Sequence, residues 1–107
     1  MNVFPAKQMN ERFAELLSEL DGMAENCAGE AAEDLEDLNA EFEDILLLVA
    51  DLKVEAADFR EEYAGALEDL LALAGDYEAL ARELPDLEEP ARRLRMVTET
   101  AMGSLEA

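Results

Sequence analysis

The chain has 107 residues, half of them hydrophobic, so it is long enough for one domain and apolar enough to bury a core. It carries 28 acidic residues against eight lysines and arginines, a formal net charge of −20 at pH 7. This charge argues against direct binding to nucleic acid or to an anionic membrane, and it points to basic surfaces or cations as partners.

The sequence lacks the features of a secreted or membrane protein. The single cysteine, Cys27, has no second cysteine with which to form an internal disulfide, and the N-terminal residues contain no apolar signal segment. The longest apolar run, residues 45–50, is far shorter than the roughly 20 residues that a membrane helix needs. We therefore expect a soluble, cytoplasmic protein.

A first helix is predicted over residues 6–27, because Pro5 is tolerated at a helix start and apolar residues recur at helical spacing. The apolar face consists of Met9, Phe13, Leu16, Leu20, Met23 and Cys27. The apolar repeat then slips by one residue near Ala28 and Gly29. Such a slip is expected where a turn separates two helices, so we place a break there.

A second, much longer helix is predicted over residues 31–84. Apolar residues between positions 35 and 84 recur at alternating spacings of three and four, the heptad pattern of a helix packed on other helices. The pattern keeps its phase across Gly65 and Gly75, the two positions at which this helix could break. The predicted oligomerisation seam consists of Leu38, Phe42, Ile45, Leu48, Val49, Leu52, Phe59 and Tyr63.

A helix of that length requires cover from outside the monomer. It would extend for about 80 Å at 1.5 Å per residue, and the first helix could cover less than half of it. A second copy would supply the missing cover, so we predict an all-α, elongated coiled coil or helical bundle that forms a homodimer, parallel or antiparallel. Residues 45–49 are apolar on nearly all sides of the helix and mark the expected centre of the oligomer.

A final helix is predicted over residues 90–105, after a short polar turn that begins at Pro85. It carries three of the eight basic residues, Arg92, Arg93 and Arg95. We expect these arginines to pair with acids of the same molecule or of a dimer partner rather than to form a dedicated binding site.

The residue types present argue against catalysis and against a cofactor or metal. The chain has no histidine, and its one cysteine lies on a core-facing helix position without an activating base. No stretch matches a calcium-binding loop, and a carboxylate-bridged di-iron bundle needs histidine. We therefore predict a non-enzymatic protein with no catalytic residue, no metal site and no cofactor.

The acidic residues are strongly segregated along the chain. The 40 residues from Phe13 to Leu52 include 13 acids and no lysine or arginine. Ordinary soluble helices mix both signs, so this one-sign surface means that repulsion is tolerated. The predicted partner-binding face consists of Glu30, Glu33, Asp34, Glu36, Asp37, Glu41, Glu43, Asp44 and Asp51.

Two functions are compatible with these features. In size, acidity and helicity the chain resembles anti-restriction and anti-CRISPR inhibitors, which mimic nucleic acid and occupy the basic surface of a nucleic-acid-binding protein; no sequence motif carries the resemblance. The alternative is a structural coiled-coil, assembly or adaptor protein that acts through its heptad seam, with the acidity serving only solubility. Both functions are protein–protein binding, and neither requires direct contact with nucleic acid or membrane.

Overall fold

The computed structural model describes residues 5–106, which form four α-helices, one short 3₁₀ helix and no strand. The elements are α1 (Ala6–Glu25), α2 (Glu30–Ala50), α3 (Phe59–Leu80), the 3₁₀ helix η1 (Pro85–Leu87) and α4 (Glu88–Glu106). The predicted all-α class is confirmed for these residues.

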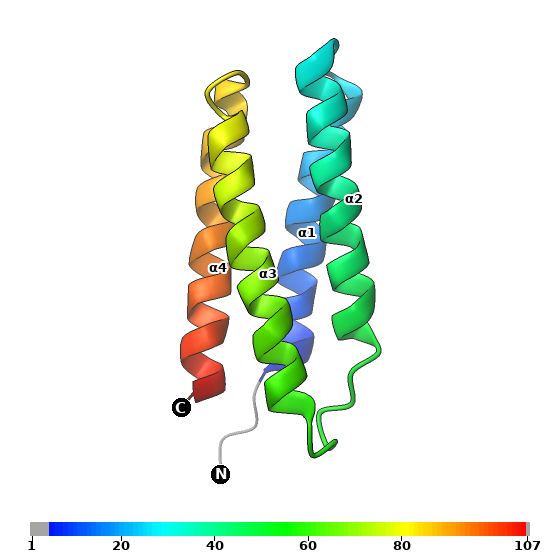
Figure 1. The fold of residues 1–107 in the computed structure, drawn as a ribbon, viewed down its shortest axis with the longest axis vertical. Coiled ribbons are helices and arrows are strands. Elements are labelled where there is room, and N and C mark those ends of the chain that lie inside the picture. Colours follow the sequence, from blue (N-terminus) through cyan, green and yellow to red (C-terminus); the bar gives the residue numbers. More distant parts are fainter. Residues whose placement is uncertain (1–4, 107) are drawn as a thin grey trace.

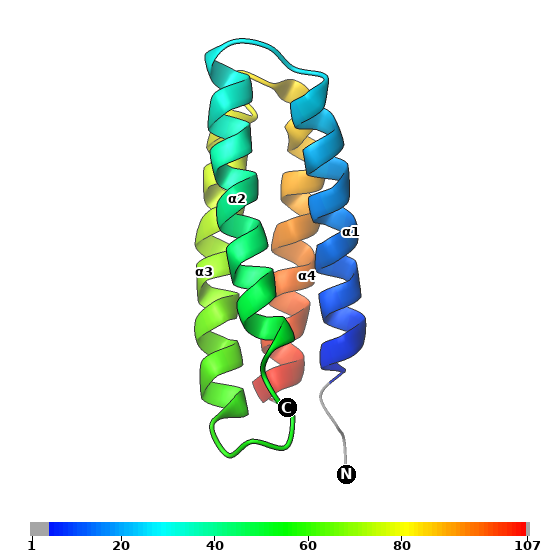
Figure 2. The ribbon, with the colours of Figure 1, turned by 90° about the vertical axis from the view of Figure 1, so that its right-hand side faces the viewer.

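The four helices form an antiparallel bundle. Each helix packs against the next in the chain, and α4 packs back against α1. The helices run up and down along the long axis, so that α1 begins and α4 ends at the same end (Figure 1). Figure 2 shows α1 and α2 side by side, joined by a turn at the opposite end. The bundle measures 48 × 21 × 18 Å, with a radius of gyration of 14.1 Å.

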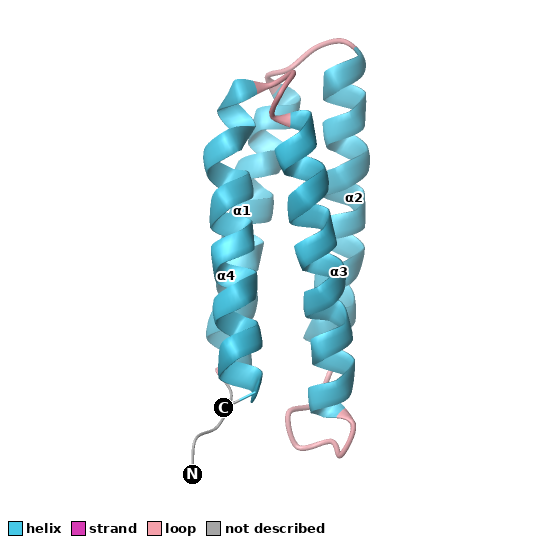
Figure 3. Cartoon of the chain, turned by 60° about the vertical axis from the view of Figure 1, so that its left-hand side comes forward, coloured by secondary structure: helices cyan, strands magenta, loops and turns pink. Residues whose placement is uncertain are grey.

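The predicted long helix over residues 31–84 is not present. Helix α2 ends at Ala50 and α3 begins at Phe59, so a loop reverses the chain in the middle of the apolar repeat. This loop and the two turns at the other end lie at the ends of the bundle (Figure 3). Gly65 and Gly75, the two positions considered for a break, lie inside α3. The apolar repeat has the same phase before and after the loop by coincidence. The phase of the repeat therefore does not reveal the loop.

A local signal for the start of α3 does exist in the sequence. Asp58 precedes the helix and Glu61 follows three residues later, a spacing that is common at helix N-termini. The Asp58 side chain makes no capping hydrogen bond in the structure, but its charge and that of Glu61 lie at the positive end of the helix dipole. Residues 51–58 contain neither glycine nor proline, so the loop lacks the residues that most often mark a helix break.

The turn between α1 and α2 contains Gly29, whose φ of 90° is the only positive value among the described residues. A residue with a side chain is strained in this conformation, whereas glycine adopts it readily. The chain can therefore reverse direction within the short segment between Glu25, the last residue of α1, and Glu30, the first of α2.

The core lies along the axis of the bundle. Phe13 of α1, Phe42 of α2 and Tyr77 of α3 are fully buried, and the Phe42 ring makes an edge contact with each of the other two at a centroid distance of 6.4 Å. Edge-to-face aromatic pairs of this kind add to the stabilisation gained from burial. The apolar stripe of α2 is thus covered by α1 and α3 of the same chain.

Candidate functional site

The predicted acidic face lies on α2 and is fully open to solvent. Its nine members, Glu30, Glu33, Asp34, Glu36, Asp37, Glu41, Glu43, Asp44 and Asp51, are all exposed. The first eight belong to α2, and Asp51 is the residue that caps its C-terminal end. The structure therefore brings the predicted residues together on one helix.

Most of these acids form a single row along the helix. Six of them follow one another at spacings of three, four or seven residues: Glu30, Glu33, Asp37, Glu41, Asp44 and Asp51. Such residues lie above one another on one face of a helix. Leu48 fills the position between Asp44 and Asp51 and is 57% exposed. The row points away from the core, because the buried residues of α2 occupy the opposite face.

The arginines of α4 pair with acids of the same chain, as predicted. The three ion pairs are Arg92–Glu88, Arg93–Glu19 and Arg95–Glu78, with nitrogen–oxygen distances of 3.6, 2.5 and 2.5 Å. The hydrogen bond from Arg95 lowers the pKa of the Glu78 carboxyl. The Arg92–Glu88 pair is largely exposed and the other two are about half-exposed, so each contributes little to stability.

The acids of α2 have no such partners. Within residues 5–106, none of them forms an ion pair with a lysine or arginine. The charges of α4 are therefore partly balanced by neighbours on α1 and α3, whereas α2 presents negative charge alone. A cationic surface approaching the bundle would be attracted most strongly to the α2 face.

The predicted oligomerisation seam is divided between the core and the surface. Four of its members, Phe42, Val49, Phe59 and Tyr63, are buried by other helices of the same chain. Leu38, Ile45 and Leu52 are half-buried, and Leu48 alone is exposed. A second copy of the chain is therefore not needed to cover the four buried residues of the seam.

An open groove runs between α1 and α2 at the end where α2 leads into the loop. Its volume is about 610 Å³, and it is lined mainly by apolar side chains, among them Leu17, Leu46 and Leu47. Sequence reasoning did not find this groove, although it noted that residues 45–49 are apolar on nearly all sides. We refer to it as the α1–α2 groove.

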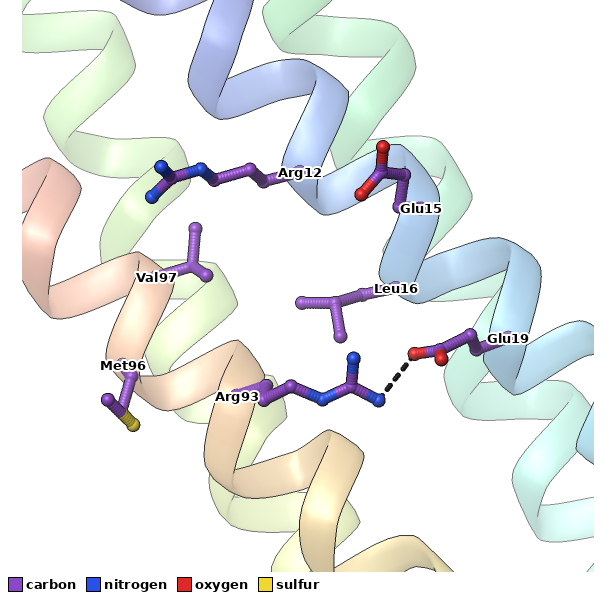
Figure 4. A pocket seen from close by; sticks show the side chains of 7 residues that line it. All are labelled: Arg12, Glu15, Leu16, Glu19, Arg93, Met96 and Val97. Atoms are coloured by element: carbon purple, nitrogen blue, oxygen red, sulfur yellow. Dashed lines mark hydrogen bonds and ion pairs between the residues drawn. The ribbon is translucent and has the colours of Figure 1, made fainter.

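A second groove, of about 400 Å³, lies between α1 and α4 (Figure 4). Arg12 and Arg93 extend into it from opposite helices, and Arg93 reaches Glu19 of α1. Met96 stands at its edge with 61% of its surface exposed. Because both signs of charge line this groove, it shows no clear preference for an ion.

Residues 5–106 contain neither a membrane-spanning helix nor a cluster of metal-ligating side chains. None of the helices there combines the length and apolarity needed to cross a bilayer. No three acidic or thiol side chains in this part of the chain converge in a way that could hold a metal ion.

Comparison of the chain with protein-family models, with curated proteins and with solved structures gives no match.

Proposed function

We propose that this protein is a non-enzymatic binding protein whose α2 face occupies a basic, nucleic-acid-binding surface of a partner protein. The observation that carries the proposal is the row of exposed carboxylates on α2, without a neutralising base in the described chain. Repulsion among these charges opposes folding, and a cationic partner would relieve it. The cost of that repulsion suggests that the charge is kept for binding.

The density of charge on α2 supports mimicry of a nucleic-acid strand. Nine carboxylates lie on the helix and its capping residue, which at 1.5 Å per residue extend for about 33 Å. All nine give roughly one charge per 4 Å and the six of the row alone roughly one per 5–6 Å, compared with about 3.4 Å per charge along one strand of DNA. A groove that accepts a phosphate backbone would therefore meet a similar linear charge on α2.

The alternative of assembly through the heptad seam has weaker support. Most of the seam is wholly or partly covered within one chain, and Leu48 is its only exposed member. A homodimer stays a prediction, which sedimentation equilibrium at moderate salt will check. The exposed leucines would have to form the contact, against the repulsion between two chains of charge −20.

The proposal is tested by neutralising the row without changing its shape. The variant Glu33→Gln, Asp37→Asn, Glu41→Gln, Asp44→Asn reduces the net charge from −20 to −16. Wild-type protein is immobilised and incubated at low salt with a lysate of the source cells. It should retain a nucleic-acid-binding protein, which is then released by duplex DNA or by a step to higher salt. The variant should retain much less of it, because its row has lost four charges.

A matched control separates position from net charge. The variant Glu68→Gln, Asp69→Asn, Asp76→Asn, Glu83→Gln also gives −16, and it removes four exposed acids that form no ion pair, on α3 and in the turn after it. This control should capture as much partner as wild-type protein. Equal capture by the α2 variant, or a partner that DNA does not displace, would contradict the proposal.

A further inference from the structure

Exposed apolar side chains are concentrated at one place on this acidic molecule. Four large hydrophobic residues are exposed among the described residues, and three of them, Leu47, Leu48 and Val54, lie at the end of α2 or in the loop after it. Leu47 and Val54 line the α1–α2 groove, whereas Leu48 does not. Apolar surface gathered in this way beside a groove is typical of an interaction site.

The α1–α2 groove has the size of a short helix. On α1 it is lined from Ala6 to Leu17, about 16 Å or three helical turns. Its apolar walls include Leu46 and Leu47 of α2 and Leu52 of the loop. A groove between two antiparallel helices can accept a third helix through apolar residues spaced three and four apart.

The charge around the groove indicates which kind of helix fits. Glu11 of α1 and Glu43 of α2 line it, and Lys7 is the only base among the lining residues. Asp44 and Asp51, which belong to the row on α2, lie close in the sequence to its apolar wall. A second copy of the chain would bring a charge of −20 toward this rim, whereas a basic helix would be attracted to it.

We infer that the α1–α2 groove binds a short, basic amphipathic helix of the partner protein. The apolar side of that helix fills the groove, and its lysines and arginines face Glu11 and Glu43. This inference rests on the proposed function and deepens it, because it names the element of the basic partner that docks. Charge brings the partner to α2, and the groove determines which segment is held.

Two synthetic peptides serve as probes. The first is a leucine–lysine peptide of about 14 residues with leucines at helical spacing, and the second has the same composition in an order that gives no apolar face. Binding is measured by fluorescence anisotropy at about 0.15 M salt, where long-range attraction is weakened. Wild-type protein should bind the amphipathic peptide about tenfold more tightly than its isomer.

Substitutions at matched exposed positions locate the site. Leu47 is 60% exposed and lines the groove, so Leu47→Asn should weaken binding of the amphipathic peptide by about tenfold. Val54→Asn, at 41% exposure on the loop side, should act in the same direction. Met96→Asn removes a side chain of similar exposure, 61%, outside the groove and should change binding by less than about twofold.

The outcomes distinguish this inference from the proposed function. If Leu47→Asn and Val54→Asn bind like wild-type protein while the four-acid variant of α2 binds both peptides weakly, the groove inference is overturned and the acidic face stands. If the groove variants bind weakly and the four-acid variant captures partner normally, the groove stands and mimicry fails. A dimer of the free protein that Leu47→Asn dissociates would also overturn the inference, because the occupant would be a second copy.

Discussion

A buried polar pair between α2 and α3 makes a sharp test of how this core is specified. The Tyr77 hydroxyl donates a hydrogen bond of 2.7 Å to Oδ1 of Asn39, and the two residues are 0% and 4% exposed. Nδ2 of Asn39 has no acceptor among the described residues. Burial, with smaller contributions from Asp21 and Glu41, raises the pKa of Tyr77, so its hydroxyl keeps its proton.

The asymmetry of this pair predicts unequal effects of substitution. Tyr77→Phe leaves both polar atoms of Asn39 buried without a partner and should lower the free energy of unfolding by about 1–3 kcal/mol. Asn39→Leu removes the unsatisfied Nδ2, keeps the number and branching of the side-chain heavy atoms and leaves only the Tyr77 hydroxyl unpaired, so it should cost less, about 0–1.5 kcal/mol. The double variant leaves no unpaired polar atom and should equal or exceed the wild-type stability.

Urea unfolding followed by circular dichroism gives the four stabilities of this double-mutant cycle. The two substitutions should couple by about 1–4.5 kcal/mol in favour of the double variant, which is the sum of the two single losses. For a chain of this length, 1 kcal/mol corresponds to roughly 4–8 °C in Tm, so thermal melts provide an independent check. If the two losses simply add, the reasoning from unsatisfied polar groups is refuted for this core.

Three further predictions follow from other parts of the structure. Burial raises the pKa of Tyr63 to about 12 from 10.0, so the folded state holds this proton more tightly than the unfolded chain does. Its stabilisation should be complete below pH 10 and lost as the pH rises toward 12, which unfolding at a series of alkaline pH values will measure. Limited trypsin digestion should cut first after Lys53, which is exposed in the loop between α2 and α3, and mass spectrometry should detect fragments 1–53 and 54–107. Early cleavage within the helices instead would contradict this loop. Asp51→Asn at the negative end of the α2 dipole should raise stability by about 0.3–1 kcal/mol, and Glu30→Gln at the positive end should lower it by a similar amount. If both substitutions change the free energy of unfolding in urea in the same direction, the overall charge, and not the helix dipole, dominates the effect on stability.

Part of the fold was predictable from local pattern. The spacing of Phe13, Leu16 and Leu20 indicated a helix and its buried face, and these residues are buried in α1. Gly29 marked the turn to α2 because the apolar repeat changed phase beside it. The pairing of the α4 arginines within the chain also followed from composition, since acids far outnumber bases.

The loop over residues 51–58 shows where local pattern failed. A heptad repeat indicates that one face of a helix is buried against other helices. Because the hydrophobic effect is non-directional, the repeat does not indicate whether those helices belong to the same chain or to a second chain. Closing the loop of eight residues between α2 and α3 costs only about 2 kcal/mol in the length-dependent part of the loop-closure entropy. Association with a second chain costs an estimated 4–15 kcal/mol in lost freedom, so the internal cover is favoured.

The helical class, the apolar stripe of each helix and the acidic face of α2 are readable from the sequence, because they follow from residue spacing along one helix. The cover of Phe42 by α1 and α3, and the exposure of Leu47 in a groove beside α1, are visible only in the packed bundle. Both outcomes depend on which helices become neighbours. Periodicity within one segment carries no information about that choice.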